Sequence, residues 1–206
     1  MSTATTLDIK HVVVGPAEQE AVLAALTSGN LSGNARAVAQ YENALSAWFT
    51  SPHAVACYSG TAAIHLALLA LGVGPGDEVI VSAAAPAMTA LPVLAVGASP
   101  VFADVAHPAT FALDRDDVAS KITGRTRAVV TVPMWGYPAD GADLAAACER
   151  WGLPLIEDAA QAHGTIVDGR RAGTHGTIGT FSTHVRKIMT TGEGGFCLTA
   201  DDPLNE

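Results

Sequence analysis

Apolar positions along the chain form short runs of strand length, separated by longer segments with the three- and four-residue spacing of helices. Strands are predicted at 54–58, 78–81, 99–105, 127–133, 153–156 and 196–199. Helices are predicted near 16–28, 35–49, 62–71, 115–121 and 140–151. Strands that follow one another roughly 25 to 30 residues apart, with helices between them, are typical of right-handed parallel crossovers. We therefore expect an α/β fold with a largely parallel, buried sheet.

The first predicted helix has clear signals at both of its ends. Pro16 lies in its first turn beside Glu18, where an acid meets the positive end of the helix dipole, and Ser28-Gly29 ends it. Segment 28–34 is too rich in Gly and Asn for regular structure and is expected to be a connector. The second helix carries one apolar stripe that we predict to be core, comprising Val38, Tyr41, Leu45 and Trp48.

Composition limits the classes of partner. The chain has 206 residues, of which 49% are hydrophobic, so residues 16–206 can form one domain after an N-terminal segment, 1–15. A formal charge of −9 without any Lys/Arg cluster argues against binding to nucleic acid or an anionic membrane. Proline, glycine or aspartate interrupts each apolar stretch before it reaches membrane-spanning length. Small molecules and other protein chains remain as expected partners.

Cysteine usage indicates the cellular compartment. Cys57, Cys148 and Cys197 are odd in number and widely spaced, without a Cys-x-x-Cys pair, and no signal-like amino terminus is present. These features predict a reducing cytoplasm. No pattern of metal ligands is found, so no metal is expected.

One candidate for chemistry follows the predicted strand 153–156. Asp158 would lie at the carboxyl end of this strand, where ligands gather in open α/β sheets. The alternative is a helix N-cap, since Ala159-Ala160-Gln161-Ala162 could open a helix. Both interpretations stay open at this point.

A second candidate is Lys187, which lies among hydroxyl-bearing residues such as Ser182 and Thr191, between two apolar strands. A Gly-rich turn, 192–195, leads from it into the strand at 196–199. A semi-buried lysine loses proton affinity and becomes a nucleophilic amine suited to Schiff-base chemistry. A solvated charge on a loop is the alternative interpretation.

Two further segments could contact a ligand. Ser59-Gly60-Thr61 joins a strand to a helix, which places backbone N–H groups and the positive helix end where a phosphate can bind. An ordinary N-cap is the alternative for this turn. Trp135-Gly136-Tyr137-Pro138 ends the strand at 127–133 on the ligand side. It could contribute to a substrate pocket, and core packing of Trp135 is an equally good interpretation.

Four segments, in this order, resemble the DegT/DnrJ/EryC1/StrS aminotransferases, from about Gly15 onward: Ser59-Gly60-Thr61-Ala62-Ala63, Gly76-Asp77-Glu78-Val79-Ile80, the segment 157–164, and Lys187 with 191–195. Members of this family are pyridoxal-phosphate enzymes that aminate keto-sugars and cyclitols. The resemblance implies the large domain of the three-layer aminotransferase fold type I, with helices on both faces of a mainly parallel sheet. It also implies glutamate or glutamine as amino donor and a nucleotide-linked keto-sugar or cyclitol as acceptor.

The resemblance implies a role for seven residues. Asp158 would hold the pyridine nitrogen protonated, and Lys187 would bind the cofactor as a Schiff base and move protons. Gln161 matches the residue near the phenolic oxygen. Gly60, Thr61 and Ser182 match the phosphate site. Pro86 stands where the family usually has an aromatic residue stacked on the pyridine ring, so Pro86 itself, Met88 or Tyr58 is expected to cover the ring.

Length is the second departure from the family, whose members carry a C-terminal region with a small domain that is absent here. The expectation is a truncated product, a fragment or one half of a split enzyme, associating as a homodimer or with a complementary chain through exposed apolar surface. The alternative functions are a non-catalytic subunit of the same fold and a sugar dehydratase. Relatives that act as dehydratases replace the lysine by histidine, so Lys187 favours transamination.

Overall fold

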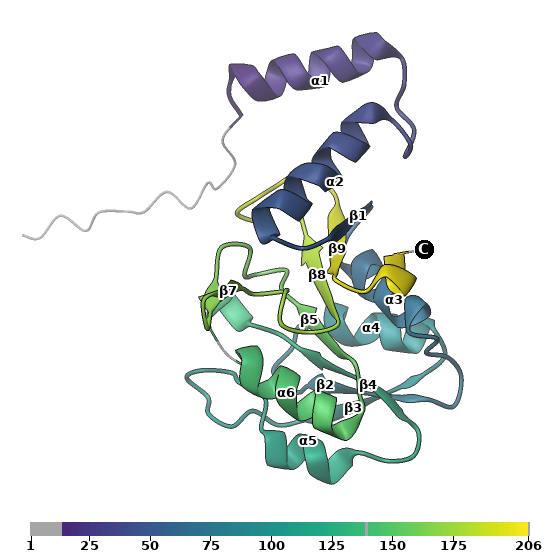
Figure 1. Cartoon of the computed structure of the whole chain (residues 1–206), viewed down its shortest axis with the longest axis vertical. Coiled ribbons are helices and arrows are strands. Elements are labelled where there is room, and N and C mark those ends of the chain that lie inside the picture. Colours follow the sequence, from purple (N-terminus) through teal and green to yellow (C-terminus); the bar gives the residue numbers. More distant parts are fainter. Residues whose placement is uncertain (1–13, 139, 206) are drawn as a thin grey trace, which may run out of the picture.

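The computed structural model describes residues 14–138 and 140–205 (Figure 1). The predicted N-terminal segment 1–15 therefore falls almost entirely outside the described residues. Seven strands form one sheet, in the spatial order β1 (His53–Cys57), β9 (Gly195–Thr199), β8 (Ile178–Ser182), β5 (Leu155–Asp158), β4 (Thr126–Thr131), β2 (Glu78–Ser82) and β3 (Ser99–Ala103).

Strand direction confirms the predicted, largely parallel sheet. Neighbours from β8 through β5, β4 and β2 to β3 pair in parallel, whereas β9 is antiparallel to both β8 and β1. Six strands therefore have their carboxyl ends at the same edge. Within this edge, the last residues of β1 and β8, Cys57 and Ser182, both pair with Gly195.

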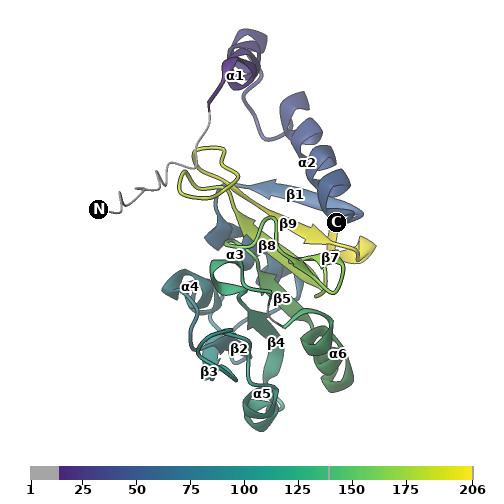
Figure 2. The ribbon, with the colours of Figure 1, turned by 90° about the vertical axis from the view of Figure 1, so that its left-hand side faces the viewer.

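Helices cover both faces of the sheet, which confirms the three-layer α/β architecture (Figure 2). On one face lie α3 (Gly60–Ala70) and α4 (Ala87–Ala95), packed on β-strand residues such as Val79 and Val81. On the other lie α2 (Arg36–Phe49), α5 (Arg115–Lys121) and α6 (Gly141–Trp151). Ile80 packs on that second face, because successive side chains of a strand point to opposite sides.

The predicted elements lack three parts of the fold, the first of which is β8 (Ile178–Ser182). Helix α4 contains Pro92 and begins directly after Pro86, and proline normally disfavours a helix interior. A small hairpin, β6 (Ile166–Val167) with β7 (Arg170–Arg171), follows β5. Two short 3-10 turns complete the elements, at Met134–Gly136 and Asp202–Asn205. None of the helices in the described ranges has both the length and the apolar character needed to cross a membrane.

The two N-terminal helices differ in how they pack. Helix α1 (Pro16–Ser28) lies away from the sheet and has no buried residue (Figure 1). Helix α2 buries Leu45 and Phe49, but Trp48, predicted as core, is 56% exposed. The Arg171 guanidinium lies 4.0 Å from the Trp48 ring centroid and stacks on it as a cation. The predicted stripe is therefore wrong at its last position, where Phe49 packs inward in place of Trp48.

Candidate functional site

One cavity of about 330 Å³ lies at the shared carboxyl edge of the sheet. Its walls come from the turns that follow β1, β2, β5 and β8, and from residues 193–194 before β9. All seven residues singled out in the sequence line it: Gly60, Thr61, Pro86, Asp158, Gln161, Ser182 and Lys187. The fold thus brings together side chains that are widely separated in the chain.

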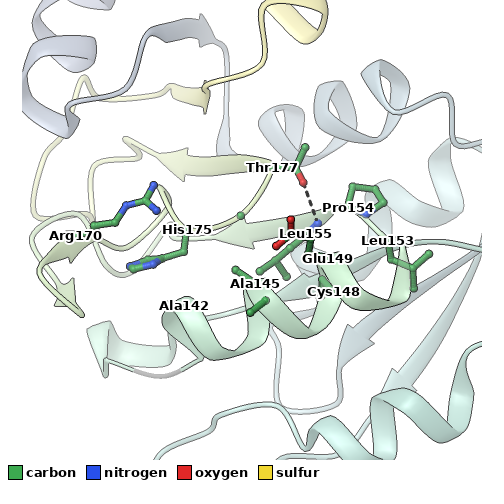
Figure 3. A pocket seen from close by; sticks show the side chains of 13 residues that line it. Ala142, Ala145, Cys148, Glu149, Leu153, Pro154, Leu155, Arg170, His175 and Thr177 are labelled. Carbon is green, nitrogen blue, oxygen red and sulfur yellow. Dashed lines mark hydrogen bonds between the residues drawn. The ribbon is translucent and has the colours of Figure 1, made fainter.

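A larger hollow, of about 630 Å³, lies elsewhere, beside the amino end of β5 (Figure 3). Arg170 and His175 lie at one end of it, and residues of α6 form its floor. Both ring nitrogens of His175 are buried without a hydrogen-bond partner among the described residues. None of the seven predicted residues lines this hollow, and it lies away from the edge where the strands end.

Asp158 is the last residue of β5 and is 7% exposed. Its Oδ2 accepts a 2.6 Å hydrogen bond from the Thr89 hydroxyl, and its Oδ1 accepts one of 3.3 Å from the Ala160 N–H. Residues 159–162 form a turn, so the interpretation of Asp158 as a helix N-cap is wrong. Burial raises the pKa of the Asp158 carboxyl, and the Thr89 and Ala160 donors partly oppose this rise. A cationic group placed against the carboxylate would favour its ionised form.

Lys187 is half-buried and lines the same cavity, so the interpretation as a solvated loop charge is wrong. Burial lowers the pKa of its ammonium group, and the negative charge of Asp158 raises it in part. Its backbone N–H donates to the His184 carbonyl at 2.8 Å, which closes a tight turn in the loop that carries it. A lysine with this environment has a larger fraction of free amine at neutral pH than an exposed lysine.

Thr183 anchors the two ends of the Lys187 loop. Its N–H donates to the Gly194 carbonyl at 2.8 Å, and its own carbonyl accepts from the Thr191 N–H at 3.0 Å. The hydroxyls of Thr183 and Thr191 lie 2.7 Å apart, and the Thr183 side chain is fully buried. The sequence analysis did not predict this role of Thr183, because the contacts with Thr191 and Gly194 form only in the folded chain.

The turn before α3 supplies donors for an anion. The Ser59 hydroxyl accepts from the Ala62 N–H at 3.1 Å, so Ser59 is the N-cap of α3. Within residues 14–138 and 140–205, no acceptor is bonded to the backbone N–H of Gly60 or Thr61, and both residues line the cavity. A Cβ on Gly60 would lie 2.6 Å from the Ser182 Cβ, so only glycine allows this close approach. Ser59 therefore caps the helix, while the N–H groups of Gly60 and Thr61 in the same turn can bind an anion. We call these two N–H groups the anion cradle.

Gln161 is oriented by the 3-10 turn after β4. Its Oε1 accepts a hydrogen bond of 3.0 Å from the Trp135 N–H, and its Nε2 lies 3.8 Å from the Met134 Sδ. Because an N–H must face an oxygen, the first contact fixes which end of the amide is which. The Gln161 amide nitrogen is therefore the donor end, and it donates to the Met134 Sδ.

Pro86 lines the cavity immediately before α4. Of the two residues considered in its place, Met88 lines the cavity, whereas Tyr58 is 78% exposed and does not. His184 and Glu193 also line it, with Nε2 and Oε1 3.6 Å apart. His163 is buried behind the wall, where its Nε2 lies 2.9 Å from the Ser182 carbonyl, and burial lowers the pKa of its imidazole.

Comparison with known proteins agrees with this geometry. Residues 13–206 match the model of the DegT/DnrJ/EryC1/StrS aminotransferase family. GDP-perosamine synthase from Caulobacter vibrioides is 40% identical over 187 residues, covering 91% of this chain and 50% of the relative. L-glutamine:2-deoxy-scyllo-inosose aminotransferase from Streptomyces kanamyceticus is 42% identical over 191 residues, 90% of this chain and 44% of the relative. A pleiotropic regulatory protein from Geobacillus stearothermophilus is 41% identical over 170 residues, 82% of this chain and 45% of the relative.

Solved structures give the same result. An aminotransferase from Psychrobacter cryohalolentis superposes with a TM-score of 0.88 at 37% identity, over 94% of this chain and 49% of that one. The pyridoxal-phosphate form of a sugar aminotransferase from Streptococcus pneumoniae superposes with a TM-score of 0.83 at 30% identity, over 93% of this chain and 52% of that one. The chain thus spans about half the length of the proteins it matches. On this match of sequence and fold, the chain belongs to the DegT/DnrJ/EryC1/StrS aminotransferase family.

Proposed function

We propose that this chain is the cofactor-binding large-domain part of an aminotransferase that moves an amino group from glutamate or glutamine to a keto-sugar or cyclitol. The observation that carries the proposal is the single cavity in which Lys187, Asp158 and the N–H groups of Gly60 and Thr61 meet. Pyridoxal phosphate presents an aldehyde, a basic ring nitrogen and a phosphate. Each has a chemical counterpart in this set.

The phosphate would bind at the first turn of α3. The backbone N–H groups of Gly60 and Thr61 and the Ser182 hydroxyl provide donors there, and the positive end of the helix favours an anion. The absence of a side chain at Gly60 lets the first turn of α3 lie close to Ser182, so both would be available to one phosphate. This donor set fits a phosphate without any arginine.

The other chemical steps fall to Asp158 and Lys187. When bound, pyridoxal phosphate supplies an electron-accepting ring that stabilises negative charge on the donor carbon. Asp158 would hold the ring nitrogen in its protonated form, and the Thr89 hydroxyl fixes the Asp158 carboxylate by a hydrogen bond. Lys187, whose ammonium pKa is lowered by burial, would hold the cofactor through its amine and would move protons at the reacting carbons. Gln161 would lie beside the phenolic oxygen.

Pro86 and Met88 bear on how tightly the cofactor is held. A stacked aromatic ring contributes about 1 kcal/mol beyond its buried area, and a pyrrolidine ring provides only part of this contact. Met88, 52% exposed beside the cavity, adds a flexible apolar side chain on the same wall. We expect weaker cofactor retention than in relatives with an aromatic residue at this position.

Donor and acceptor classes are proposed from the relatives. The name of the Streptomyces kanamyceticus relative contains glutamine and a keto-cyclitol, and that of the Caulobacter vibrioides relative contains a nucleotide-linked amino sugar. We propose the same broad classes for this chain. The free thiols of Cys57, Cys148 and Cys197 are compatible with the cytoplasm as the site of the reaction.

A second polypeptide is part of the proposal, as a homodimer or a complementary chain. Helix α1 exposes Val22, Leu23 and Leu26 by 58 to 65%, and none of its described residues is buried. An apolar helix face of this kind needs a covering surface. Residues 16–206 would then be the large domain of a longer assembly.

A non-catalytic subunit is the second candidate, favoured by two observations. Pro86 replaces the stacking aromatic, and one relative at 41% identity is named a regulatory protein. A sugar dehydratase is a further variant, which the presence of Lys187 disfavours.

The test begins with pyridoxal phosphate added to the purified chain. We expect a visible absorbance band, and borohydride reduction should fix the cofactor on one of only three lysines, Lys10, Lys121 and Lys187. Peptide mass mapping should place it on Lys187. Lys187→Ala should abolish the band, whereas Lys121→Ala, on α5 in an ion pair with Asp117, should keep it. A chain that gains neither band nor adduct would overturn the aminotransferase proposal.

Two outcomes separate the remaining alternatives. A band without amino transfer, even in the presence of a complementary chain, would favour the non-catalytic subunit. Product formation from a sugar substrate without any amino donor would favour the dehydratase.

A further inference from the structure

Two aromatic side chains meet near the carboxyl end of β4, and neither lines the cavity: Trp135, which is exposed, and Phe111, which is half-buried. The Trp135 side chain is 65% exposed, so the interpretation of Trp135 as a core residue is wrong. Its ring meets that of Phe111 edge to face, with centroids 4.8 Å apart and planes at 82°. We call Trp135 and Phe111 the aromatic platform.

The backbone presents both rings at a conformational cost. Trp135 has φ 52° and Phe111 has φ 56°, a left-handed conformation that bulky residues rarely adopt. Tertiary contacts hold the first turn: the Thr165 hydroxyl donates to the Gly136 carbonyl at 2.8 Å. Strain that the surrounding structure maintains tends to occur at functional positions, which makes the platform a candidate site.

A second contact holds the Phe111 loop to the same part of the sheet. The Leu113 N–H donates to Oδ1 of Asp140 at 2.9 Å, and the other carboxylate oxygen of Asp140 accepts from the Thr131 hydroxyl at the end of β4. Asp140 therefore ties the loop of Phe111 to the strand from which Trp135 emerges.

The platform is connected directly to the candidate site. The Trp135 N–H donates to the Gln161 side chain at 3.0 Å, and Gln161 lines the cavity that holds Lys187. One hydrogen bond therefore separates the residue that carries the exposed ring from the cavity wall. A ligand that extends from Lys187 past Gln161 would therefore meet Trp135 next.

The chemistry of the platform selects an uncharged ring. Neither of its residues carries a charge, and the anion donors of the site lie at the start of α3 instead. Aromatic faces bury the apolar C–H face of a ring while leaving its hydroxyl groups in water. We propose that Trp135 and Phe111 bind the hydroxylated carbon ring of the amino acceptor, and so select a cyclitol or sugar ring. This inference rests on the proposed aminotransferase function.

Tryptophan fluorescence provides a test that does not depend on turnover. The chain has three tryptophans, so Trp48→Phe with Trp151→Phe leaves Trp135 as the single emitter. In this background, loaded with pyridoxal phosphate, scyllo-inosose should change the emission in a saturable way, and guanosine diphosphate alone should not. In the otherwise unchanged chain, Trp135→Ala should weaken scyllo-inosose binding about tenfold by calorimetry, with the visible band unchanged. Trp135→Phe should restore most of this affinity.

Trp48→Ala is the matched control, because Trp48 is also exposed but lies on α2 under Arg171. It should leave scyllo-inosose binding unchanged. A response to guanosine diphosphate but not to scyllo-inosose would overturn the proposal in favour of a nucleobase site. Unchanged emission with both scyllo-inosose and a nucleotide-linked keto-sugar, while the cofactor band forms, would also overturn it. Failure of the band itself would instead count against the proposed function.

Discussion

The Thr89 hydroxyl donates a 2.6 Å hydrogen bond to Oδ2 of Asp158, and both side chains are buried. Thr89 lies on α4 and Asp158 at the end of β5, so the contact joins two elements across the cavity. Hydrogen bonds to a charged group contribute about 1.5 to 3 kcal/mol. Thr89 is therefore a positioning residue for the carboxylate that would face the cofactor.

Thr89→Val should weaken pyridoxal-phosphate binding, because it removes the donor that favours the ionised form of Asp158. The expected loss is about tenfold or more in Kd, measured by titrating the visible band. Thr89→Ser keeps the hydroxyl and should restore most of the affinity. Equal affinities for the threonine and valine forms would show that the contact has no role in cofactor binding.

Gly60→Ala should damage both the anion cradle and the fold. The new Cβ would lie 2.6 Å from the Ser182 Cβ, and overpacking of this kind costs about 1 to 3 kcal/mol. Gly124→Ala is the matched control, since a Cβ there meets no atom within 4 Å. Urea unfolding and cofactor titration of both variants provide the comparison. If both behave alike, the close approach of Gly60 to Ser182 does not matter.

Asp158→Asn should shift the reactivity of Lys187 toward lower pH. Burial lowers the pKa of the Lys187 ammonium, and the negative charge of Asp158 raises it in part. Removing that charge leaves burial less opposed, so more free amine is present at a given pH. The rate of borohydride-trapped adduct formation against pH measures the midpoint. A midpoint that stays in place, or moves upward, contradicts this electrostatic coupling.

Asp140→Asn should remove a pH-dependent part of the stability of the protein. Burial raises the pKa of the Asp140 carboxyl from 3.8 to about 6, so between these values the folded state binds more protons than the unfolded state. The contribution of Asp140 to the free energy of unfolding therefore falls as the pH rises from 3.8 to about 6, by about 3 kcal/mol in total. Urea unfolding should show a smaller change in stability between pH 4 and pH 7 for the variant than for the parent. A difference between variant and parent that is independent of pH would contradict the assignment.

The parallel sheet and the clustering of the seven site residues could both be predicted from sequence. Parallel strands place their carboxyl ends at one edge, so residues that follow different strands, such as Gly60 and Asp158, meet there. Lys187 is predicted from its polar surroundings between two strands. The sheet therefore follows from periodicity and chain order, and part of the site does not. Three of the seven residues are predicted only from the resemblance to the family: Gln161, Ser182 and Pro86.

The remaining features depend on contacts between distant residues. Thr89 reaches Asp158 only because α4 forms despite Pro92, which argues locally against a helix. The exposed Trp48 ring stacks on the guanidinium group of Arg171, which lies more than a hundred residues later in the chain. The exposure of Trp135 depends on a left-handed turn that its residue type does not favour. Tertiary structure overrides local preference in all three cases.

The position of β9 has a consequence for the order of folding. It lies between β8 and β1, and the Ser51 hydroxyl before β1 donates to the Thr199 carbonyl across 148 residues of chain. Strands β2 to β5, and the pair formed by β8 and β9, are joined by much shorter loops, whose closure costs less entropy, so we expect them to pair before β1 joins β9. Pulsed hydrogen exchange should then protect Val129 in β4 before Val55 in β1. The anion cradle, which follows β1, would be completed last, and a bound phosphate would stabilise the segment that folds last.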